Sequence, residues 1–405
     1  MSSWTRCTTA GAGASTSTWV TTSKRRGSGE SAGSEFTISP VGSGRAPGPT
    51  IAEQECESVN SPIYRAGIIG LGFIGAADQI SGDALGQQVE NLDGTHLGAL
   101  AGNPRIRLVA GSSRDSGRRA RFEERAGVGS YADWREMIAA EALDLVSVAT
   151  YTPVHEEITV ACARAGIRAI YCEKPMASRV SEGDRMLRAC RESGSLLAIN
   201  HNRRFHPNYR LLRDLIGDGK LGELTSVNVQ WSSGRLGNVG THLFDAIRMV
   251  TGRRVEAVSG TLDLAGKPDC RGPAFQDPGG WGLMRLEGGV MVTVDASDYA
   301  RVPMSLSING SKGRALTGGD EVSLEYWDGR QEQWPSLRSQ ATGMDRAVQE
   351  IVAWLDGRGP FAYDAAEALQ VLESIVAFHV SHARSGAWTE LPLQGEDRNR
   401  LLNTG

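Results

Sequence analysis

The chain has no long apolar run, few aromatic residues and almost no excess of either charge. Aromatic residues make up 6% of its 405 residues, and the formal net charge is only −4. No apolar stretch approaches the roughly 20 residues that span a bilayer. Charges this balanced give no electrostatic reason to bind nucleic acid or an anionic membrane surface. We therefore expect no membrane span and no nucleic-acid partner.

Cysteine is also sparse and scattered. No two cysteines form a Cys-x-x-Cys pair, and no group of Cys and His has zinc spacing, so we expect no metal site. The six are Cys7, Cys56, Cys162, Cys172, Cys190 and Cys270. Scattered cysteines in a long chain are typical of reduced thiols, which predicts a cytoplasmic protein with these residues as small buried hydrophobes.

Residues 1–60 differ from the rest of the chain. They are rich in Ser, Thr and Gly and show no apolar period, so they cannot bury enough surface to offset the entropy of ordering. Arg25 and Arg26 raise the question of a secretion signal, but no apolar segment follows them, and we expect none. We predict a disordered tail, with a start codon assigned too far upstream as the alternative.

From residue 61 to about 200, short apolar runs alternate with amphipathic ones. Strands are predicted at 63–69, 105–111, 143–149, 167–172 and 195–200, and helices at 133–140, 154–165 and 181–192. This alternation predicts a parallel sheet with right-handed helical crossovers. The fold class is therefore α/β for this part of the chain.

Beyond residue 200 the pattern changes. Helices are predicted at 209–216 and 241–250, alternating strands between 255 and 327, and two more helices at 345–355 and 365–383. Strands followed by helices indicate an α+β domain with a mostly antiparallel sheet. We place a first domain at 61–200 and a second, for substrate binding and oligomerisation, at 201–395.

A glycine-rich turn follows the first of these strands. Gly70, Gly72 and Gly75, with Phe73 and Ile74 between them, fit the pattern G-x-G-x-x-G. The first glycine allows the turn, the second lets the backbone approach a diphosphate, and the third lets the helix pack closely. Helix N-terminal amides would then bind the diphosphate, which predicts a Rossmann domain that binds NAD or NADP.

The end of the second strand bears on which dinucleotide is bound. An acid there binds the ribose 2′-hydroxyl of NAD, whereas arginine and small polar residues accommodate the 2′-phosphate of NADP. Ser113 occupies the expected acid position and Arg114 follows it, which favours NADP modestly. Asp115 remains an alternative acid if the register differs by two.

Residues 78–94 look like an insertion between the turn and its helix. They lengthen the distance from the glycines to the second strand well beyond the usual spacing of about 20 residues. The segment is either a lid over the site or a surface insertion without a role.

Glu173-Lys174-Pro175 follows the fourth strand. Ligands of parallel sheets bind outside the carboxyl ends of the strands, so Lys174 would face the cofactor. Partial burial would lower the pKa of Lys174, which would let it orient a substrate hydroxyl and help move its proton. A surface lysine at the start of a loop is the alternative.

Taken together, these pieces resemble the family of glucose–fructose oxidoreductase, inositol dehydrogenase and MocA. The matching segments are the turn at 70–75, Thr150-Tyr151-Thr152-Pro153 with His155, Glu173-Lys174-Pro175, residues 201–205 (HNRRF) and residues 240–245 (GTHLFD). The resemblance implies an open-faced antiparallel sheet in the second domain, a homo-oligomer (a dimer or tetramer), and NAD(P)-dependent chemistry on a secondary alcohol or ketone of a sugar, cyclitol or polyol.

The resemblance also assigns site residues. It implies a catalytic lysine, Lys174, and a catalytic histidine, His242, with an aspartate four residues before the histidine. Here that position is Asn238, and an amide cannot accept a proton as a carboxylate would. Cofactor contacts are implied for Thr150, Thr152, Pro153, His155, Glu173 and Lys174.

The residues around His242 allow more than one interpretation. At a predicted helix start, the helix dipole would lower the pKa of His242 and favour the neutral base. Asp245 would orient His242, contact substrate or face solvent. His201 and Arg203 would contact substrate or lie on the surface. Two other functions stay open: a dinucleotide-binding regulator without catalysis, and a redox-neutral epimerase or lyase that uses a transient ketone.

Overall fold

The computed structural model describes residues 62–80, 94–232, 234–265, 272, 274–297, 302–337 and 341–404, together with two short strands nearer the N-terminus. These strands, β1 (Thr5–Cys7) and β2 (Thr18–Val20), pair antiparallel within a separate unit, Met1–Val59. The rest of the predicted disordered tail lies outside the described residues. The second unit, Asn60–Gly405, contains both large sheets.

Six parallel strands form the first sheet, in the order β5-β4-β3-β6-β7-β8. They are β3 (Tyr64–Ile69), β4 (Ile106–Ser112), β5 (Gly129–Tyr131), β6 (Leu145–Val148), β7 (Ala169–Cys172) and β8 (Leu196–Ile199). Every residue of β6 and β7 is buried, as expected for central strands covered on both faces. The strand order reverses between β3 and β6, so the carboxyl ends of these two strands open a crevice.

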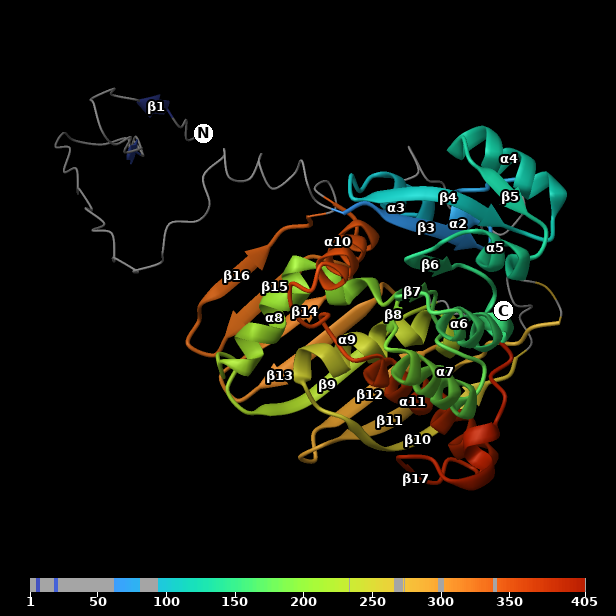
Figure 1. Ribbon diagram of the computed structural model, residues 1–405. Coiled ribbons are helices and arrows are strands. Elements are labelled where there is room, and N and C mark those ends of the chain that lie inside the picture. The colour runs from blue at the N-terminus through green and yellow to red at the C-terminus, as the bar shows by residue number, and fades with distance from the viewer. Residues whose placement is uncertain are drawn as a thin grey trace. The chain divides into compact units, whose positions relative to one another are not determined.

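Helices connect these strands (Figure 1). They are α2 (Phe73–Ala76), α3 (His96–Ala101), α4 (Ser116–Ala126), α5 (Trp134–Ala140), α6 (His155–Arg164) and α7 (Val180–Ser193). Asp115 and Asp133 cap the N-termini of α4 and α5, since each side chain accepts a backbone N–H of the first turn. The predicted Rossmann-type α/β architecture is confirmed.

The second sheet has nine strands in the order β16-β15-β14-β13-β9-β12-β11-β10-β17. They are β9 (Leu224–Gln230), β10 (Val255–Asp263), β11 (Gly279–Leu286), β12 (Met291–Ala296), β13 (Ser305–Gly310), β14 (Gly313–Thr317), β15 (Val322–Tyr326), β16 (Gln331–Trp334) and β17 (Thr389–Glu390). Only β9 and β12 run parallel, which confirms the predicted mostly antiparallel sheet. Strand β12 follows the hairpin turn formed by residues 286–290.

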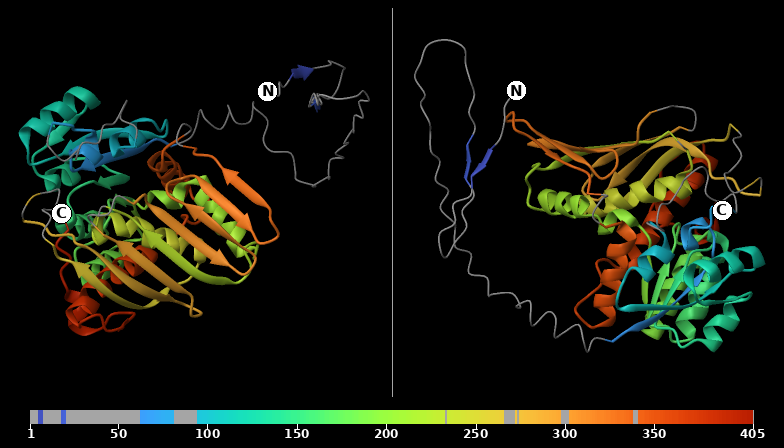
Figure 2. Two further views of the ribbon diagram at one scale, coloured as in Figure 1. Left: turned by 180° about the vertical axis from the view of Figure 1, so that it is seen from behind. Right: turned by 90° about the horizontal axis from the view of Figure 1, so that it is seen from above.

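Burial alternates along β13, β14 and β15, so one face of this sheet is covered and the other is not. The right-hand view of Figure 2 shows helices on one side of it. The helices of this part are α8 (Pro207–Gly217), α9 (Thr241–Thr251), α10 (Gly343–Leu355) and α11 (Ala365–Ala383). Phe244 of α9 stacks on Phe378 of α11, with their ring centroids 5.7 Å apart, in the core beneath the sheet.

Four single turns complete the described elements: η1 (Thr152–Val154), η2 (Asn202–Phe205), the π-helical η3 (Leu236–Gly240) and η4 (Gly395–Asn399). None of the helices in the described part of the chain is long and apolar enough to cross a bilayer. The predicted division at residue 200 falls between β8 and η2, within a single unit of the structure, and stays a prediction.

Candidate active site

The glycine-rich turn lies where β3 ends. Gly70 has a φ of +101°, and a Cβ on it would lie 2.4 Å from the Ala149 carbonyl oxygen at the end of β6. A Cβ on Gly75 would lie 2.0 Å from the carbonyl oxygen of Gly70. Side chains at these two positions would therefore collide with backbone. The turn packs directly against the strand on the far side of the crevice, as the motif requires.

The helix after the turn is cut short. Helix α2 has only four residues and is capped by Ala77, whose φ is +55°. Asp78 follows, 2% exposed, and accepts hydrogen bonds from Nε (2.9 Å) and Nη2 (2.7 Å) of Arg121 on α4. The predicted insertion therefore begins after one helical turn rather than before the helix. Its residues 81–93 lie outside the described part, and the chain resumes at Gly94 before α3.

Ser113 and Arg114 follow β4, as predicted. The hydroxyl of Ser113 accepts the backbone N–H of Asp115 at 3.3 Å, and the Arg114 side chain is exposed. Asp115 is engaged as the N-cap of α4, where its carboxylate accepts the Arg118 N–H at 2.8 Å. This capping role gives Asp115 a structural function, and Ser113 and Arg114 remain the residues predicted to meet the adenosine ribose.

The end of β6 supplies the next group of predicted cofactor residues. The Thr150 hydroxyl is buried and has no hydrogen-bond partner among the described residues. His155, fully buried, links the carbonyl oxygens of Thr150 (3.1 Å) and Pro175 (3.0 Å) through its two ring nitrogens. Thr152 is buried in η1, whereas Pro153 is exposed. His155 thus ties the ends of β6 and β7 together.

Glu173 at the end of β7 is the centre of a buried polar network. Its Oε1 accepts from Asn200 Nδ2 at 2.6 Å and lies 3.1 Å from His96 Nε2, while its Oε2 accepts the backbone N–H of Lys174. Burial alone would raise the pKa of Glu173, but the contacts with His96, Lys174 and Asn200 hold that pKa at about 2. The carboxylate is therefore charged and fixes the backbone that carries Lys174.

His96 was missed by the sequence analysis. Its other ring nitrogen, Nδ1, contacts the hydroxyl of Ser147 on β6, so the imidazole bridges two strands. It is fully buried in α3, immediately after the insertion. In the sequence, His96 is only a histidine within a short apolar segment, and such histidines are too common to indicate a functional site.

Lys174 meets Asn238 across the crevice. Its Nζ donates to the side-chain oxygen of Asn238 at 2.5 Å and to the Asn238 backbone oxygen at 3.1 Å. Asn238 lies in η3, the turn of π-helix before α9. Single π-turns inside helices are often found at functional sites. The structure thus brings together the lysine and the amide that the sequence placed 64 residues apart.

Asp277 holds this π-turn and was also missed. Its two carboxylate oxygens accept the backbone N–H groups of Gly237 and Asn238, each at 2.7 Å. Asp277 is 7% exposed and comes from the irregular segment before β11. A carboxylate is therefore present near Asn238, but both of its oxygens are bonded to backbone amides.

His242 is the second residue of α9. Its Nδ1 is buried without a hydrogen-bond partner among the described residues, although the residue as a whole is only partly buried. Burial holds the pKa of His242 well below its usual range, and the nearby charges of Lys174, Arg203 and His201 lower it further. The predicted direction holds, with burial as the largest cause. The imidazole is neutral and able to accept a proton.

Asp245 is a correction to the sequence analysis. It is 0% exposed, so it does not face solvent, and its contacts are with Arg204 and His201 rather than with His242, while its contact with substrate stays a prediction. Its two oxygens accept from Arg204 Nε at 2.8 and 2.9 Å, and Oδ1 lies 3.1 Å from His201 Nδ1. A buried guanidinium attracts the carboxylate more strongly than a neutral imidazole three residues away.

His201 lies between this ion pair and His242. Its Nε2 is 3.0 Å from the Thr241 hydroxyl, and its ring meets that of His242 edge-on, with centroids 6.2 Å apart. His201 is 2% exposed, and its contact with substrate stays a prediction. Arg203 is half-buried: its Nε donates to the Tyr209 hydroxyl at 3.1 Å, and its Nη2 lies 3.3 Å from Met304 Sδ.

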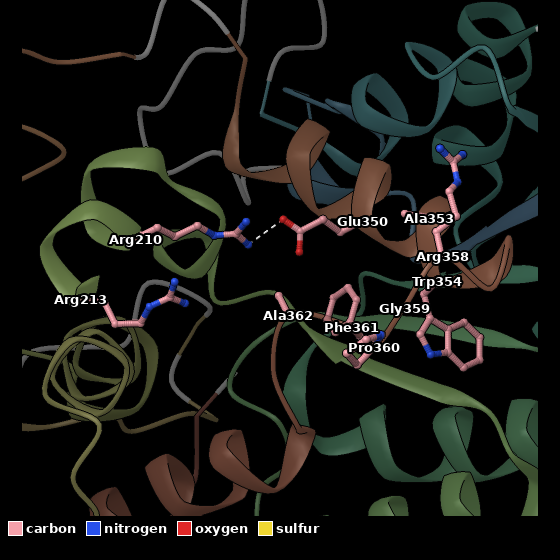
Figure 3. Close-up of a pocket in the computed structure, with 10 residues that line it drawn as sticks. All are labelled: Arg210, Arg213, Glu350, Ala353, Trp354, Arg358, Gly359, Pro360, Phe361 and Ala362. Carbon is pink, nitrogen blue, oxygen red and sulfur yellow. Dashed lines mark ion pairs between the residues drawn. The ribbon is translucent and has the colours of Figure 1, made fainter. Parts of the chain in front are cut away.

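A cavity of about 210 Å³ lies elsewhere, between α8, α10 and residues 358–362 (Figure 3). Arg210 and Glu350 face each other across it in an ion pair of 2.6 Å, and Trp354 and Phe361 add aromatic surface. None of the predicted site residues lines this cavity. It is separate from the crevice that holds Lys174 and His242.

The crevice suits a nicotinamide dinucleotide. The backbone leaves no room for a side chain at Gly70 or Gly75, and the buried Thr150 hydroxyl beside the turn lacks a partner among the described residues. Backbone amides at such a turn bind diphosphate, and an unpaired buried hydroxyl is ready for a ligand's polar group. The residues present therefore fit the cofactor that the sequence predicts.

Comparisons with known proteins agree with this geometry. Residues 64–201 match the model of an oxidoreductase family with an NAD-binding Rossmann fold, and residues 228–316 match the GFO/IDH/MocA C-terminal domain. Myo-inositol 2-dehydrogenase of Thermotoga maritima is 26% identical over 266 residues, covering 62% of this chain and 74% of its own. Inositol 2-dehydrogenase of Corynebacterium glutamicum is 26% identical over 334 residues, covering 75% and 90%.

A solved structure is also similar. The inositol dehydrogenase homologue of Azotobacter vinelandii, in complex with NADH and myo-inositol, superposes with a TM-score of 0.67 at 20% identity, covering 82% of this chain and 98% of its own. The two family models and the similar inositol dehydrogenases support the predicted enzyme class, an NAD(P)-dependent dehydrogenase that acts on CH–OH groups. The chain belongs to the Gfo/Idh/MocA family of oxidoreductases.

Proposed function

We propose that this protein oxidises a secondary alcohol of a sugar, cyclitol or related polyol, or reduces the corresponding ketone, with NAD or NADP. One observation supports the proposal above all. Lys174 and Asn238 are bonded to each other, and the neutral imidazole of His242 lies one helical turn from Asn238, at the end of a sheet whose glycine turn fits a dinucleotide.

When bound, the nicotinamide supplies the acceptor or donor of hydride. The protein's own residues position the substrate and move a proton. The Lys174 ammonium, held by the two oxygens of Asn238, orients the reacting hydroxyl. His242 accepts the hydroxyl proton at Nε2, which requires that its Nδ1 carry the other proton. Glu173, paired with His96, keeps the lysine backbone in place.

Replacing Lys174 by Met tests this proposal. Turnover, followed at 340 nm with a panel of polyols, should fall by a factor of about 10² to 10⁴, because a positioned donor is lost. Binding of NADH, followed by its fluorescence, should persist. Lys220→Met, an exposed lysine after α8, is the matched control. Unchanged turnover in the Lys174 variant would remove this residue from the chemistry.

The cofactor preference is a finer part of the proposal. Ser113 and the exposed Arg114 at the end of β4 support a modest preference for NADP(H). Arg114→Ala should lower kcat/KM for NADP about tenfold relative to NAD, the loss of one charge-assisted contact of about 1.4 kcal/mol. Arg107→Ala, which removes an exposed arginine from the same strand, is the control. An unchanged ratio would contradict a role for Arg114.

Asn238 keeps one alternative open, that of a dinucleotide-binding regulator without catalysis. Turnover with any polyol excludes it. Homo-oligomeric assembly and a cytoplasmic location stay predictions of the sequence.

A further inference from the structure

Residues 402–404 form a short strap that leads toward the chain end marked C in Figure 1. The strap is anchored on the side of the first sheet, because the backbone N–H of Leu402 donates to the Ser178 carbonyl oxygen at 2.8 Å. Ser178 follows Lys174 in the loop between β7 and α7. The Leu402 side chain is 1% exposed and belongs to the larger hydrophobic core. The strap is therefore fixed to the loop that carries Lys174.

The strap is also bonded to the irregular segment before β11. The carbonyl oxygen of Asn403 accepts the backbone N–H of Gln276 at 2.9 Å, and the Asn403 side-chain Nδ2 donates to the Ala274 carbonyl oxygen at 2.9 Å. Asp277 follows directly, and its carboxylate accepts the two backbone amides that fix η3. The strap thus connects the loop after Lys174 with the segment that holds the π-turn.

Thr404 packs directly against the π-turn. Its side chain is buried, and a Cβ on Gly237 would lie 2.3 Å from Thr404 Cγ2 and 3.0 Å from Asp277 Oδ1. The φ of Gly237 lies outside the left-handed region, so the neighbouring atoms, rather than the backbone conformation, exclude a side chain here. Gly237 immediately precedes Asn238. The methyl group of Thr404 therefore limits the position of the residue that bonds with Lys174.

The strap is bonded to the segments on both sides of the contact between Lys174 and Asn238. In that contact, Lys174 Nζ donates to both oxygens of Asn238, at 2.5 and 3.1 Å. Such hydrogen bonds weaken steeply when the two groups separate or turn. A misplacement of about 1 Å at an active site can lower the rate of an enzyme about 10²-fold. The strap is therefore placed to set a distance on which turnover depends.

We infer that the strap is a positioning element of the active site, in which Asn403 and Thr404 hold the π-turn at the place where Asn238 meets Lys174. The inference rests on the proposed function and adds two residues to its machinery. Asn403 and Thr404 are positioning residues, because they act through η3 and not on the substrate. Their loss should lower kcat more than it raises KM, since Lys174 and His242 are still present but are aligned less often.

Asn403→Ala tests the inference without removing a buried side chain, because Asn403 is exposed. The kcat for the panel of polyols should fall about fivefold, the effect of losing one hydrogen bond that holds the site. The melting temperature and the Kd of NADH should stay the same. Asn399→Ala, which removes another exposed asparagine shortly before the strap, is the matched control and should leave kcat unchanged.

A second readout does not require turnover. Amide hydrogen exchange, followed by mass spectrometry, reports local opening of the backbone in residues 236–240. In Asn403→Ala these amides should exchange several times faster, because the segment that bears Asp277 is held less firmly. The amides of β7, and those of α9 beyond its first turn, should be unchanged. This pattern separates a local release of η3 from a general loss of stability.

A double-mutant cycle tests the contact between Thr404 and Gly237. Gly237→Ala alone should lower kcat about tenfold, because the added methyl group collides with Thr404 and displaces the π-turn. In a Thr404→Ala background the same substitution should cost much less, since space for the methyl group is then available. Thr404→Val keeps a methyl group against Gly237 and should lose less turnover than Thr404→Ala.

Independent, multiplicative effects of Gly237→Ala and Thr404→Ala on kcat overturn the proposed coupling. Unchanged exchange and kcat in Asn403→Ala overturn the role of the strap, as does a fall in its melting temperature with no change in kcat. If the unmodified protein turns over no polyol, the proposed function fails instead. The exchange measurement then still decides whether the strap holds the π-turn, so the two failures are distinguishable.

Discussion

The two sides of the crevice are built differently. On the sheet side, Glu173 bonds with His96, Asn200 and the backbone of Lys174, and Asn200 in turn accepts the Tyr171 hydroxyl. On the opposite side, His242 leaves a buried nitrogen without a partner in the described residues, and the side chain that bonds with Lys174, Asn238, is neutral.

This contrast separates residues that stabilise the fold from residues that act in the reaction. A fully bonded buried network is rigid and costly to disturb. A buried group with few partners contributes little to the stability of the fold. We expect substitutions on the sheet side to affect stability first, and those around His242 to affect turnover first.

The largest effect should come from His242→Gln. Turnover should fall by a factor of about 10² to 10⁴ because the proton acceptor is lost. Stability to urea should stay the same or rise slightly, since a buried unpaired nitrogen is removed. His382→Gln, at the far end of α11, is the control. A large loss of stability without loss of turnover would reverse the contrast between the two sides.

Glu173→Gln should act in the opposite way. Its folded pKa of about 2 lies below its usual 4.5, so the carboxylate stabilises the fold above pH 4.5 and loses that effect as pH falls toward 2. At neutral pH the variant should lose about 3 kcal/mol of unfolding free energy, from 1.36 kcal/mol per pKa unit. Urea titrations should show the gap to the unmodified protein closing between pH 4.5 and 2. A gap independent of pH would contradict the charged state of Glu173.

The smallest expected effect is in the pH profile. The acid limb of kcat/KM should fall below pH 6.5, because the pKa of His242 is held below that usual value and the base is lost only when pH drops through it. Between pH 6.5 and 8 the profile should be flat with respect to this group. A limb at or above pH 6.5 would show that His242 is more exposed to water than its burial indicates.

Much of the fold was predictable because it follows local rules. The glycine turn at Gly70–Gly75 and the Glu-Lys-Pro motif of Lys174 are each formed by consecutive residues, so each can be recognised in the sequence. The helix predicted at 365–383 has the same bounds in the structure. Parallel strands buried on both faces read as short apolar runs, which the sequence shows plainly.

The residues that were missed or misread depend on contacts between distant segments. His96 meets Glu173 from the far side of the insertion, and Asp277 meets η3 from an irregular segment without periodicity. Asp245 was misread because its spacing from His242 fits one helix face, whereas its charge is drawn to Arg204 on a different element. Spacing along a helix predicts neighbours, but the strongest opposite charge nearby decides the contact.

The two hydrogen bonds that Asp277 accepts from successive backbone amides matter for the redesign of this site. Because one carboxylate secures both Gly237 and Asn238, the π-turn can shift only together with the segment that bears Asp277. To change the substrate specificity of this enzyme, substitutions in residues 274–278 should therefore be more effective than a substitution of Asn238 alone, which leaves the backbone of the π-turn in place.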